Sequence, residues 1–286
     1  MKLTVLEATD TFLKVRFDDV APHVVNALRR TLVADVPKMA IEDVEFHLGP
    51  IRAEDGKEYE SVAPLFDEIV AQRLGLVPIP TDLTLFNRRQ DCPNCKGEGC
   101  PSCTIIYSLN KRGPATVFSG DLEPIGDTGL RIRDANIPIT KLGEGQALLV
   151  YATAQLGTGR EHAKFQVAQG AGYAFVPVLR VGGKTFEASQ SKVPACTDHV
   201  LVPTSAEEET VELRADCKAC KRFSEEYDAK TVKVWWDPSK VVLHFETDGS
   251  LSANETFVAA LDILEKRFRE VGTIADGIGA QEKAAA

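Results

Sequence analysis

The sequence lacks an apolar run long enough to cross a membrane, and its first residues, MKLTVLEATDTFLKVRF, contain no signal-peptide core. It also lacks an excess of basic residues, because 33 Lys and Arg stand against 42 Asp and Glu, a net charge of −9. Strong nucleic-acid binding depends mainly on Lys and Arg that neutralise phosphates. We therefore expect a cytoplasmic protein that neither contacts a membrane nor binds nucleic acid strongly by itself.

Common catalytic motifs are missing too. The chain has no P-loop, no G-x-S-x-G elbow and no Asp-x-Asp-x-Asp motif that could hold magnesium. Its five histidines are scattered, and no two of them stand at the spacing of metal ligands or of a nucleophile and its base. We predict that this chain has no catalytic residues of its own.

The 286 residues suggest two or three domains of an α+β protein. At the N-terminal end, residues 3–17 alternate as two short strands around Ala8, Thr9 and Asp10. An apolar stripe at helical spacing follows, on Val24, Val25, Leu28 and Leu32. Val44, Phe46 and Leu48 then alternate with charges, which predicts a half-buried strand.

The C-terminal end has a similar pattern. Residues 231–236 and 241–246 predict two strands joined in a hairpin at Asp237-Pro238-Ser239. Ser252 and Glu255 form a capping box that predicts the start of a helix. Apolar residues then recur in steps of four and three, at Phe257, Leu261, Leu264, Phe268 and Val271. Such a helix packs on its own domain or also meets a partner helix, and the spacing leaves both open. Residues 281–286 are expected to be frayed.

The middle of the chain is predicted to be mainly β. A short helix is expected first, with apolar positions at Phe66, Ile69, Val70 and Leu74. Strand-like runs follow at residues 104–109, 147–155 and 175–181, separated by Gly and Pro.

Four cysteines stand in thirteen residues, DCPNCKGEGCPSC. They form two C-x2-C pairs, Cys92 with Cys95 and Cys100 with Cys103, joined by Lys-Gly-Glu-Gly. Four thiolates complete the closed tetrahedral shell of a structural zinc site, and a reducing cytosol disfavours disulfides. A four-iron cluster is the competing interpretation, since it also takes four thiolates. The third interpretation is four reduced cysteines that bind no metal.

The second cysteine group is incomplete. Cys217 and Cys220 begin a ferredoxin-type C-x2-C-x2-C-x3-C run, but Phe223 and Tyr227 occupy its last two positions. Cys196 fits the fourth position of another such run, whose first three positions are not cysteine. All three cysteines would serve one cluster. A retained cluster and a ferredoxin-like fold that has lost its metal are both open.

Three segments carry a resemblance to a known family. NALRRTLVADVPKMAIEDVEF, from Asn26, is similar to the first-helix signature of the α-like subunits of cellular RNA polymerases. SVAPLFDEIVAQRLGLVPIPTD resembles the next segment in the archaeal α-like subunits, called D, and in their eukaryotic counterpart. HAKFQ at 162–166 and FETDGSLSANETFVAALDILEKRF at 245–268 continue the match. The chain resembles the archaeal D subunits over nearly its whole length.

The resemblance implies a domain order. Residues 1–48 and 228–272 would form a discontinuous dimerisation domain. Residues 49–172 would be an inserted domain with the cysteine loop at 91–103, residues 173–227 a ferredoxin-like domain, and residues 273–286 a tail. It also favours zinc in the cysteine quartet. For the other three cysteines it implies a three-iron cluster or none.

The resemblance implies a function as well. The chain would pair with the small subunit L and, with subunits N and P, form the platform for the large catalytic subunits. Arg29 and Arg30 would contact a large subunit. The dimer interface would contain Leu28, Leu32, Phe257, Leu261, Leu264 and Phe268. The alternatives are an iron–sulfur electron carrier or redox-enzyme subunit, and a zinc-finger nucleic-acid binder, which the acidic charge disfavours.

Overall fold

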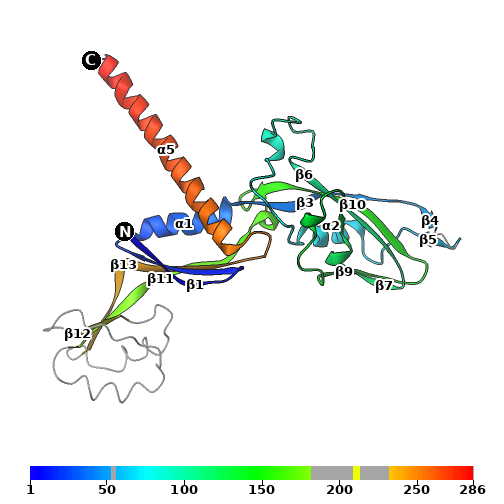
Figure 1. Ribbon diagram of the computed structural model, residues 1–286, viewed down its shortest axis with the longest axis horizontal. Coiled ribbons are helices and arrows are strands. Elements are labelled where there is room, and N and C mark those ends of the chain that lie inside the picture. The colour runs from blue at the N-terminus through cyan, green and yellow to red at the C-terminus, as the bar shows by residue number, and fades with distance from the viewer. Residues whose placement is uncertain (53–55, 182–208, 213–231, 286) are drawn as a thin grey trace. The chain divides into compact units, whose positions relative to one another are not determined.

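The computed structural model describes residues 1–52, 56–181, 209–212 and 232–285. The chain divides into two compact units, and each combines segments that are far apart in the sequence. Unit 1 contains residues 1–29 and 170–245, and unit 2 contains residues 30–169 and 246–286. The described part is a mixed α/β structure made mostly of sheets (Figure 1). The proposed domain boundaries remain predictions.

Unit 1 is built on a five-stranded sheet. Its strands, in spatial order, are β1 (Lys2–Ala8), β2 (Phe12–Asp18), β13 (Val232–Thr247), β11 (Ala168–Val181) and β12 (Glu209–Glu212). β1 and β2 form the predicted antiparallel pair. Their turn is held by Thr9, whose hydroxyl oxygen accepts a hydrogen bond from the Phe12 backbone N–H at 2.9 Å. Alternate residues of β2, namely Leu13, Val15 and Phe17, are buried, as period-two alternation requires.

The predicted hairpin around Asp237 is wrong, because β13 runs through these residues as one continuous strand. The Asp237 carboxylate accepts hydrogen bonds from the backbone N–H of Ser239, at 2.9 Å, and from its hydroxyl, at 2.6 Å. This short-range motif satisfies the turn-forming side chain without reversing the chain. The Ser239 carbonyl accepts a bond from the Val20 backbone N–H at 3.3 Å.

Helix α1 (Pro22–Ala34) contains the predicted apolar stripe. Val25, Leu28 and Leu32 are buried on one side of it. Val24 is 42% exposed, so it does not belong to the buried stripe. At helical spacing, residues 25, 28 and 32 share a face, and residue 24 lies about 70° from the centre of that face, at its edge.

Unit 2 is built on a four-stranded antiparallel sheet. Its order is β3 (Pro37–Phe46), β10 (Ala147–Thr158), β6 (Thr104–Arg112) and β8 (Glu123–Pro124). Two of these strands were predicted, at 104–109 and 147–155, and both extend three residues further. The strand predicted at 44–48 ends at Phe46, and Leu48 beyond it is exposed.

Smaller elements complete unit 2. Two hairpins pair β4 (Pro50–Arg52) with β5 (Glu58–Glu60) and β7 (Ala115–Phe118) with β9 (Pro138–Leu142). Short 3-10 helices are η1 (Arg89–Asp91), η2 (Ser119–Asp121), η3 (Thr128–Leu130) and η4 (Ala163–Phe165). Helix α2 (Asp67–Gly75) buries Val70 and Leu74, whereas Phe66, just before it, is 78% exposed. Phe66 was wrongly placed on the helix.

The core of unit 2 lies on its main sheet. Fully buried members include Met39, Ile79, Tyr107, Ile139 and Leu148. The Tyr107 hydroxyl donates a 2.7 Å hydrogen bond to the Leu130 carbonyl, and burial raises the pKa of this phenol. The Tyr107 hydroxyl therefore stays neutral and donates to the Leu130 carbonyl oxygen, so that neither polar group is unpaired inside the apolar core.

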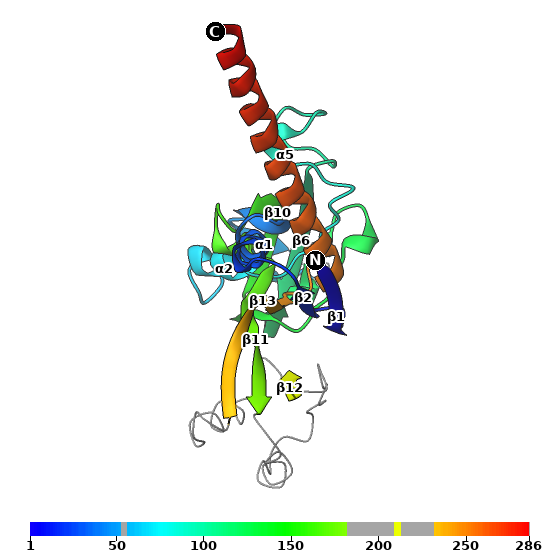
Figure 2. The same cartoon turned by 90° about the vertical axis from the view of Figure 1, so that its left-hand side faces the viewer.

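Helix α5 (Ala253–Ala285) is one continuous helix of 33 residues (Figure 2). The predicted capping box begins it: the Ser252 hydroxyl accepts from the Glu255 N–H at 3.2 Å, and the Glu255 carboxylate accepts from the Ser252 N–H at 3.0 Å. The backbone is helical to Ala285, and fraying of residues 281–286 remains a prediction. No described helix is both long and apolar enough to span a bilayer.

Candidate metal centre

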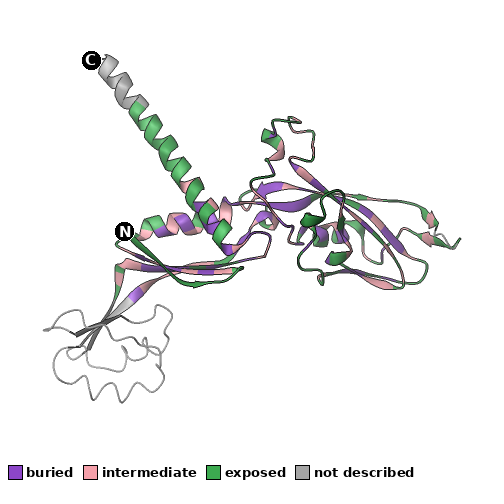
Figure 3. Ribbon diagram, viewed as in Figure 1, coloured by how far each residue is buried: buried purple, intermediate pink, exposed green. Residues whose placement is uncertain are grey.

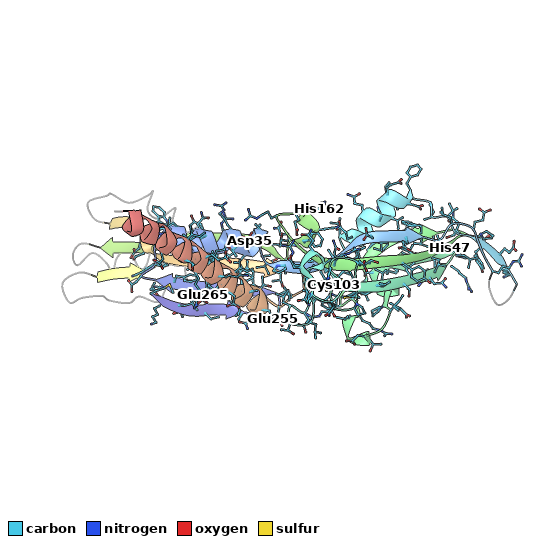
Figure 4. The ribbon with its side chains drawn as sticks, turned by 90° about the horizontal axis from the view of Figure 1, so that it is seen from above. Asp35, His47, Cys103, His162, Glu255 and Glu265 are labelled. Carbon is cyan, nitrogen blue, oxygen red and sulfur yellow. The ribbon has the colours of Figure 1, made fainter. Side chains whose placement is uncertain are left out.

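The cysteine quartet lies where η1 gives way to β6. Cys92 directly follows η1, and Cys103 directly precedes β6, so both ends of the loop are attached to regular structure. Cys92 and Cys103 are buried, while Cys95 and Cys100 are half-buried. Figure 4 labels Cys103 among its neighbouring side chains. The loop therefore turns its sulfur atoms inward, away from water.

The four Sγ atoms form a compact group. The separations are 3.7 Å for Cys92 and Cys100, 3.6 Å for Cys95 and Cys103, and 3.8 Å for Cys100 and Cys103. All four sulfur atoms lie within 4.8 Å of one another. A disulfide requires about 2 Å, whereas tetrahedral sulfur ligands at about 2.3 Å from one ion stand about 3.8 Å apart. The cysteines therefore fit a single tetrahedral ion.

Backbone groups of the loop favour thiolates. The Gly99 N–H donates to the Cys95 sulfur at 3.2 Å, and the Cys100 N–H donates to the Cys103 sulfur at 3.3 Å. Burial raises the pKa of Cys95, but hydrogen bonds from the Gly99 and Gly97 backbone outweigh it and lower this pKa to about 6. Burial raises the pKa of Cys103 to about 12. The quartet thus combines a ready thiolate with a thiol that needs a cation beside it to ionise.

The short connection between the two pairs depends on left-handed backbone. Lys96, Gly97 and Gly99 have φ values of 50°, 100° and 104°. Glycine adopts this region without steric cost, so Gly97 and Gly99 allow four residues to turn the second cysteine pair back onto the first.

Arg89 clamps this loop to the sheet, and no sequence pattern indicated this role. Its guanidinium donates to the carbonyls of Gly97, at 3.0 Å, and Glu98, at 3.1 Å. It also donates, over 3.4 Å each, to Asp43 of β3 and Gln155 of β10. A planar group with five donors can serve both sides at once. Only the fold brings residues 43 and 155 beside the loop.

The other predicted site residues lie on the two long helices. Arg30 is exposed on α1, and the half-buried Arg29 donates to the Asn26 side chain at 3.2 and 3.1 Å. Leu28 and Leu32 are buried. On α5, Phe257 is buried and Leu264 half-buried, whereas Leu261 and Phe268 are 40% and 65% exposed. Cys196, Cys217 and Cys220, and most of the expected ferredoxin-like domain, lie outside the described residues.

The HAKFQ segment supports strand β3. In β3, Glu42 is an extra residue, because the pairing with β10 shifts between Ile41 and Asp43. Lys164 of η4 donates to the Ile41 carbonyl at 2.9 Å and pairs with the Glu42 carboxylate at 2.5 Å. The lysine thus bonds both to the backbone beside the bulge and to the side chain of its extra residue.

Comparison with known proteins defines the class. Residues 51–178 match the RNA polymerase Rpb3/RpoA insert domain. This match covers a domain of α-like RNA polymerase subunits within unit 2 and the start of β11. The chain is 44% identical to DNA-directed RNA polymerase subunit Rpo3 of Thermoplasma volcanium, over 94% of this chain and 97% of that protein. It is 42% identical to Rpo3 of Picrophilus torridus over the same shares, and 31% identical to Rpo3 of Methanosarcina mazei over 96% and 98%.

The chain belongs to the Rpo3 family of DNA-directed RNA polymerase subunits, the α-like D subunits of archaea. It is therefore a transcription protein whose partners are other subunits of the polymerase. These relatives do not favour the alternative of an iron–sulfur electron carrier.

Proposed function

We propose that the chain is a non-catalytic assembly subunit of the polymerase. In this role it pairs with the small α-like subunit L in the cytoplasm and, with subunits N and P, forms the platform for the large catalytic subunits. The observation that carries the proposal is an apolar row along α5. We define the α5 row as Phe257, Leu261, Leu264 and Phe268.

The α5 row begins in the core and continues onto exposed helix. Beyond the buried Phe257, exposure reaches 65% at Phe268, and Val271 and Ile274 further along are 63% and 64% exposed. Figure 3 shows exposed residues over most of α5 after its first turns. Exposed large apolar side chains that recur along a helix are typical of a surface that a partner covers. Spacings of three and four suit a partner helix.

The heterodimer can be tested on α5 itself. We expect Phe268→Glu to weaken binding to purified subunit L by about thirtyfold or more, because it places a charge in a desolvated apolar contact. Lys266→Glu is the matched control, since residue 266 is exposed on the same helix and lies about 200° around it from residue 268. Titration calorimetry or gel filtration of the mixed subunits gives the affinity. Equal binding by both variants would refute the proposed pairing surface.

We also propose that Cys92, Cys95, Cys100 and Cys103 hold one zinc ion as a structural clip. The support is the sulfur spacing, which suits a single ion. A four-iron cluster places a different iron under each cysteine and so spreads the thiolates further apart. Four protein ligands leave no position for water or substrate, so the ion would stabilise the loop and take no part in catalysis. A three-iron cluster on Cys196, Cys217 and Cys220 remains a separate hypothesis.

Metal analysis tests the clip. We expect the complex with subunit L, purified without oxygen, to contain about one zinc ion per chain in the quartet. Cys92→Ser/Cys95→Ser should lose that zinc, whereas Cys217→Ser should keep it. Iron and acid-labile sulfide are measured on the same samples. Iron that disappears with the quartet variant would overturn the zinc proposal, and iron that disappears only with Cys217→Ser would support the separate cluster.

A further inference from the structure

A groove in unit 2 lies against the first turns of α5. It has a volume of about 700 Å³, and three segments line it: the chain after α2, the loop around η3, and α5 itself. Sixteen residues line the groove, and they come from the ranges 80–85, 127–133 and 251–262. We call this the α5 groove. It is separate from the cysteine quartet, and the α5 row does not line it.

Hydrogen bonds hold the three walls together. The Thr81 N–H donates to the Ser250 carbonyl at 3.0 Å, which joins the first wall to the residues that lead into α5. Arg133 donates to the Gly249 carbonyl over 3.4 Å, which joins the second wall to the same turn. The Asp82 carboxylate accepts from the N–H groups of Thr84 and Leu85 and so fixes the first wall. The groove is therefore largely preformed, which lowers the entropic cost of binding.

The surface of the groove is both apolar and acidic. Leu85 and Val258 are 58% and 47% exposed and offer aliphatic contacts. Four carboxylates, those of Asp82, Asp127, Glu255 and Asp262, stand against one guanidinium, that of Arg133. Figure 4 labels Glu255 at the start of α5.

Hydrogen bonds favour the charged form of two of these carboxylates, those of Asp82 and Glu255. A hydrogen bond from the Thr84 hydroxyl lowers the pKa of Asp82, and one from the Ser252 hydroxyl lowers that of Glu255. The bonds that Asp82, Asp127 and Glu255 accept inside the chain use one oxygen of each carboxylate. The groove thus presents several negative charges to whatever enters it.

We propose that the α5 groove binds an extended segment of another polymerase subunit, one that carries Lys or Arg beside aliphatic residues. Complementary charge identifies the occupant, because an acidic surface repels nucleic acid and acidic peptides alike. Single exposed ion pairs contribute little to affinity. The aliphatic contacts with Leu85 and Val258 therefore supply most of the binding affinity, and the carboxylates select a basic segment over other segments. The inference rests on membership of the polymerase and not on the α5 row.

Photocrosslinking in the assembled polymerase tests the occupant. Val258 is replaced by photoreactive benzoyl-phenylalanine, the enzyme is purified and irradiated, and the crosslinked peptides are identified by mass spectrometry. We expect a crosslink to a Lys/Arg-rich segment of another subunit. The absence of an intersubunit crosslink, a crosslink to a second copy of this chain, or one to a segment without excess basic residues would overturn the proposal.

Charge reversal tests the selection. Asp127→Lys/Asp262→Lys should reduce retention of the crosslinked subunit by about tenfold, with a weaker dependence on salt than in the unaltered enzyme. Glu123→Lys/Glu144→Lys, a change of equal charge at exposed residues outside the groove, should retain it normally. Equal loss in both variants would refute charge-based docking. Because both variants leave the α5 row intact, both should still form the heterodimer with subunit L, so loss of the groove's occupant can be distinguished from loss of the proposed heterodimer.

Discussion

At the residue scale, a side chain outside the cysteine quartet holds the quartet's loop in place. The four sulfur atoms come from a loop with left-handed turns at Gly97 and Gly99. Arg89 donates hydrogen bonds both to this loop and to the strands beneath it. Groups outside the ligand shell commonly orient ligands in this way. We infer that Arg89 holds the loop near its metal-binding geometry before the ion arrives.

Replacing Arg89 should therefore weaken metal binding without removing a ligand. We expect Arg89→Ala to lower zinc affinity by about tenfold or more, the usual effect of losing an orienting residue. Arg88→Ala is the matched control, because Arg88 pairs with Glu161 and not with the loop. Competition with a coloured chelator measures the affinity of both variants. If the two lose affinity equally, or if Arg89→Ala loses none, Arg89 does not position the site.

At the scale of elements, a buried carboxylate fixes the direction of α5. Asp35, just beyond α1, is only 6% exposed at its side chain. It accepts from Arg267 of α5 at 2.6 Å and from Arg160, next to β10, at 3.0 and 2.7 Å. Three elements of unit 2 thus meet at one acid, which Figure 4 labels. The contact lies one residue before Phe268, so it also sets where the α5 row points.

This carboxylate should make stability depend on pH. The hydrogen bond from Arg267 lowers the pKa of Asp35 below its usual 3.8, and Arg160 adds to the shift against the opposing effect of burial. An acid whose pKa is lower in the folded state stabilises the protein above the unfolded-state pKa and stops doing so as pH falls through the folded-state value. The contribution should therefore be complete near neutrality and be lost progressively as pH falls below about 4.

Asp35→Asn tests this. We expect it to reduce the free energy of unfolding by about 2 kcal/mol at pH 7, because the negative charge that accepts three hydrogen bonds from two arginines is removed. Urea unfolding at pH 7 and at the lowest pH where both proteins still fold gives the difference, which should shrink on acidification. Asp276→Asn, at an exposed position far along the same helix, serves as the control. A difference that stays constant with pH would show that the charge of Asp35 does not stabilise the fold.

At the scale of the whole molecule, the two chain ends supply the long helices and the middle supplies the metal loop and the α5 groove's loops. The family places these parts in a multisubunit enzyme. The exposed surfaces of α1, α5 and the α5 groove are therefore the ones available to other subunits. Arg30 is an exposed cation on α1, and the resemblance to α-like subunits implies that it contacts a large subunit.

Loss of this charge should weaken assembly and leave the chain folded. We expect Arg30→Ala to reduce recruitment of a large subunit to the complex with L by about tenfold, the cost of losing a well-placed arginine at an interface. Lys141→Ala, an exposed cation on β9, is the control. Pull-down of the purified large subunits measures recruitment, and circular dichroism of the free chain checks the fold. Normal recruitment by Arg30→Ala would remove this residue from the interface.

Local features could be predicted from the amino-acid sequence alone. Alternation predicted β1 and β2, the apolar stripe predicted α1, and the Ser252–Glu255 box predicted the start of α5. Each of these signals acts between residues that are close along the chain, so no tertiary contact is needed to read it. The spacing of the four cysteines belongs to the same class, because short loops leave their sulfur atoms few ways to lie apart.

Contacts between distant segments depend on the packing of the whole fold. Asp237-Pro238-Ser239 has the composition of a turn, yet neighbouring strands on both sides hold β13 straight through it. Three features combine residues more than forty positions apart: the bonds of Arg89 to β3 and β10, the meeting of Asp35 with Arg160 and Arg267, and the walls of the α5 groove. Such contacts form only when sheets and helices pack, and the free energy of that packing, not local preference, selects them.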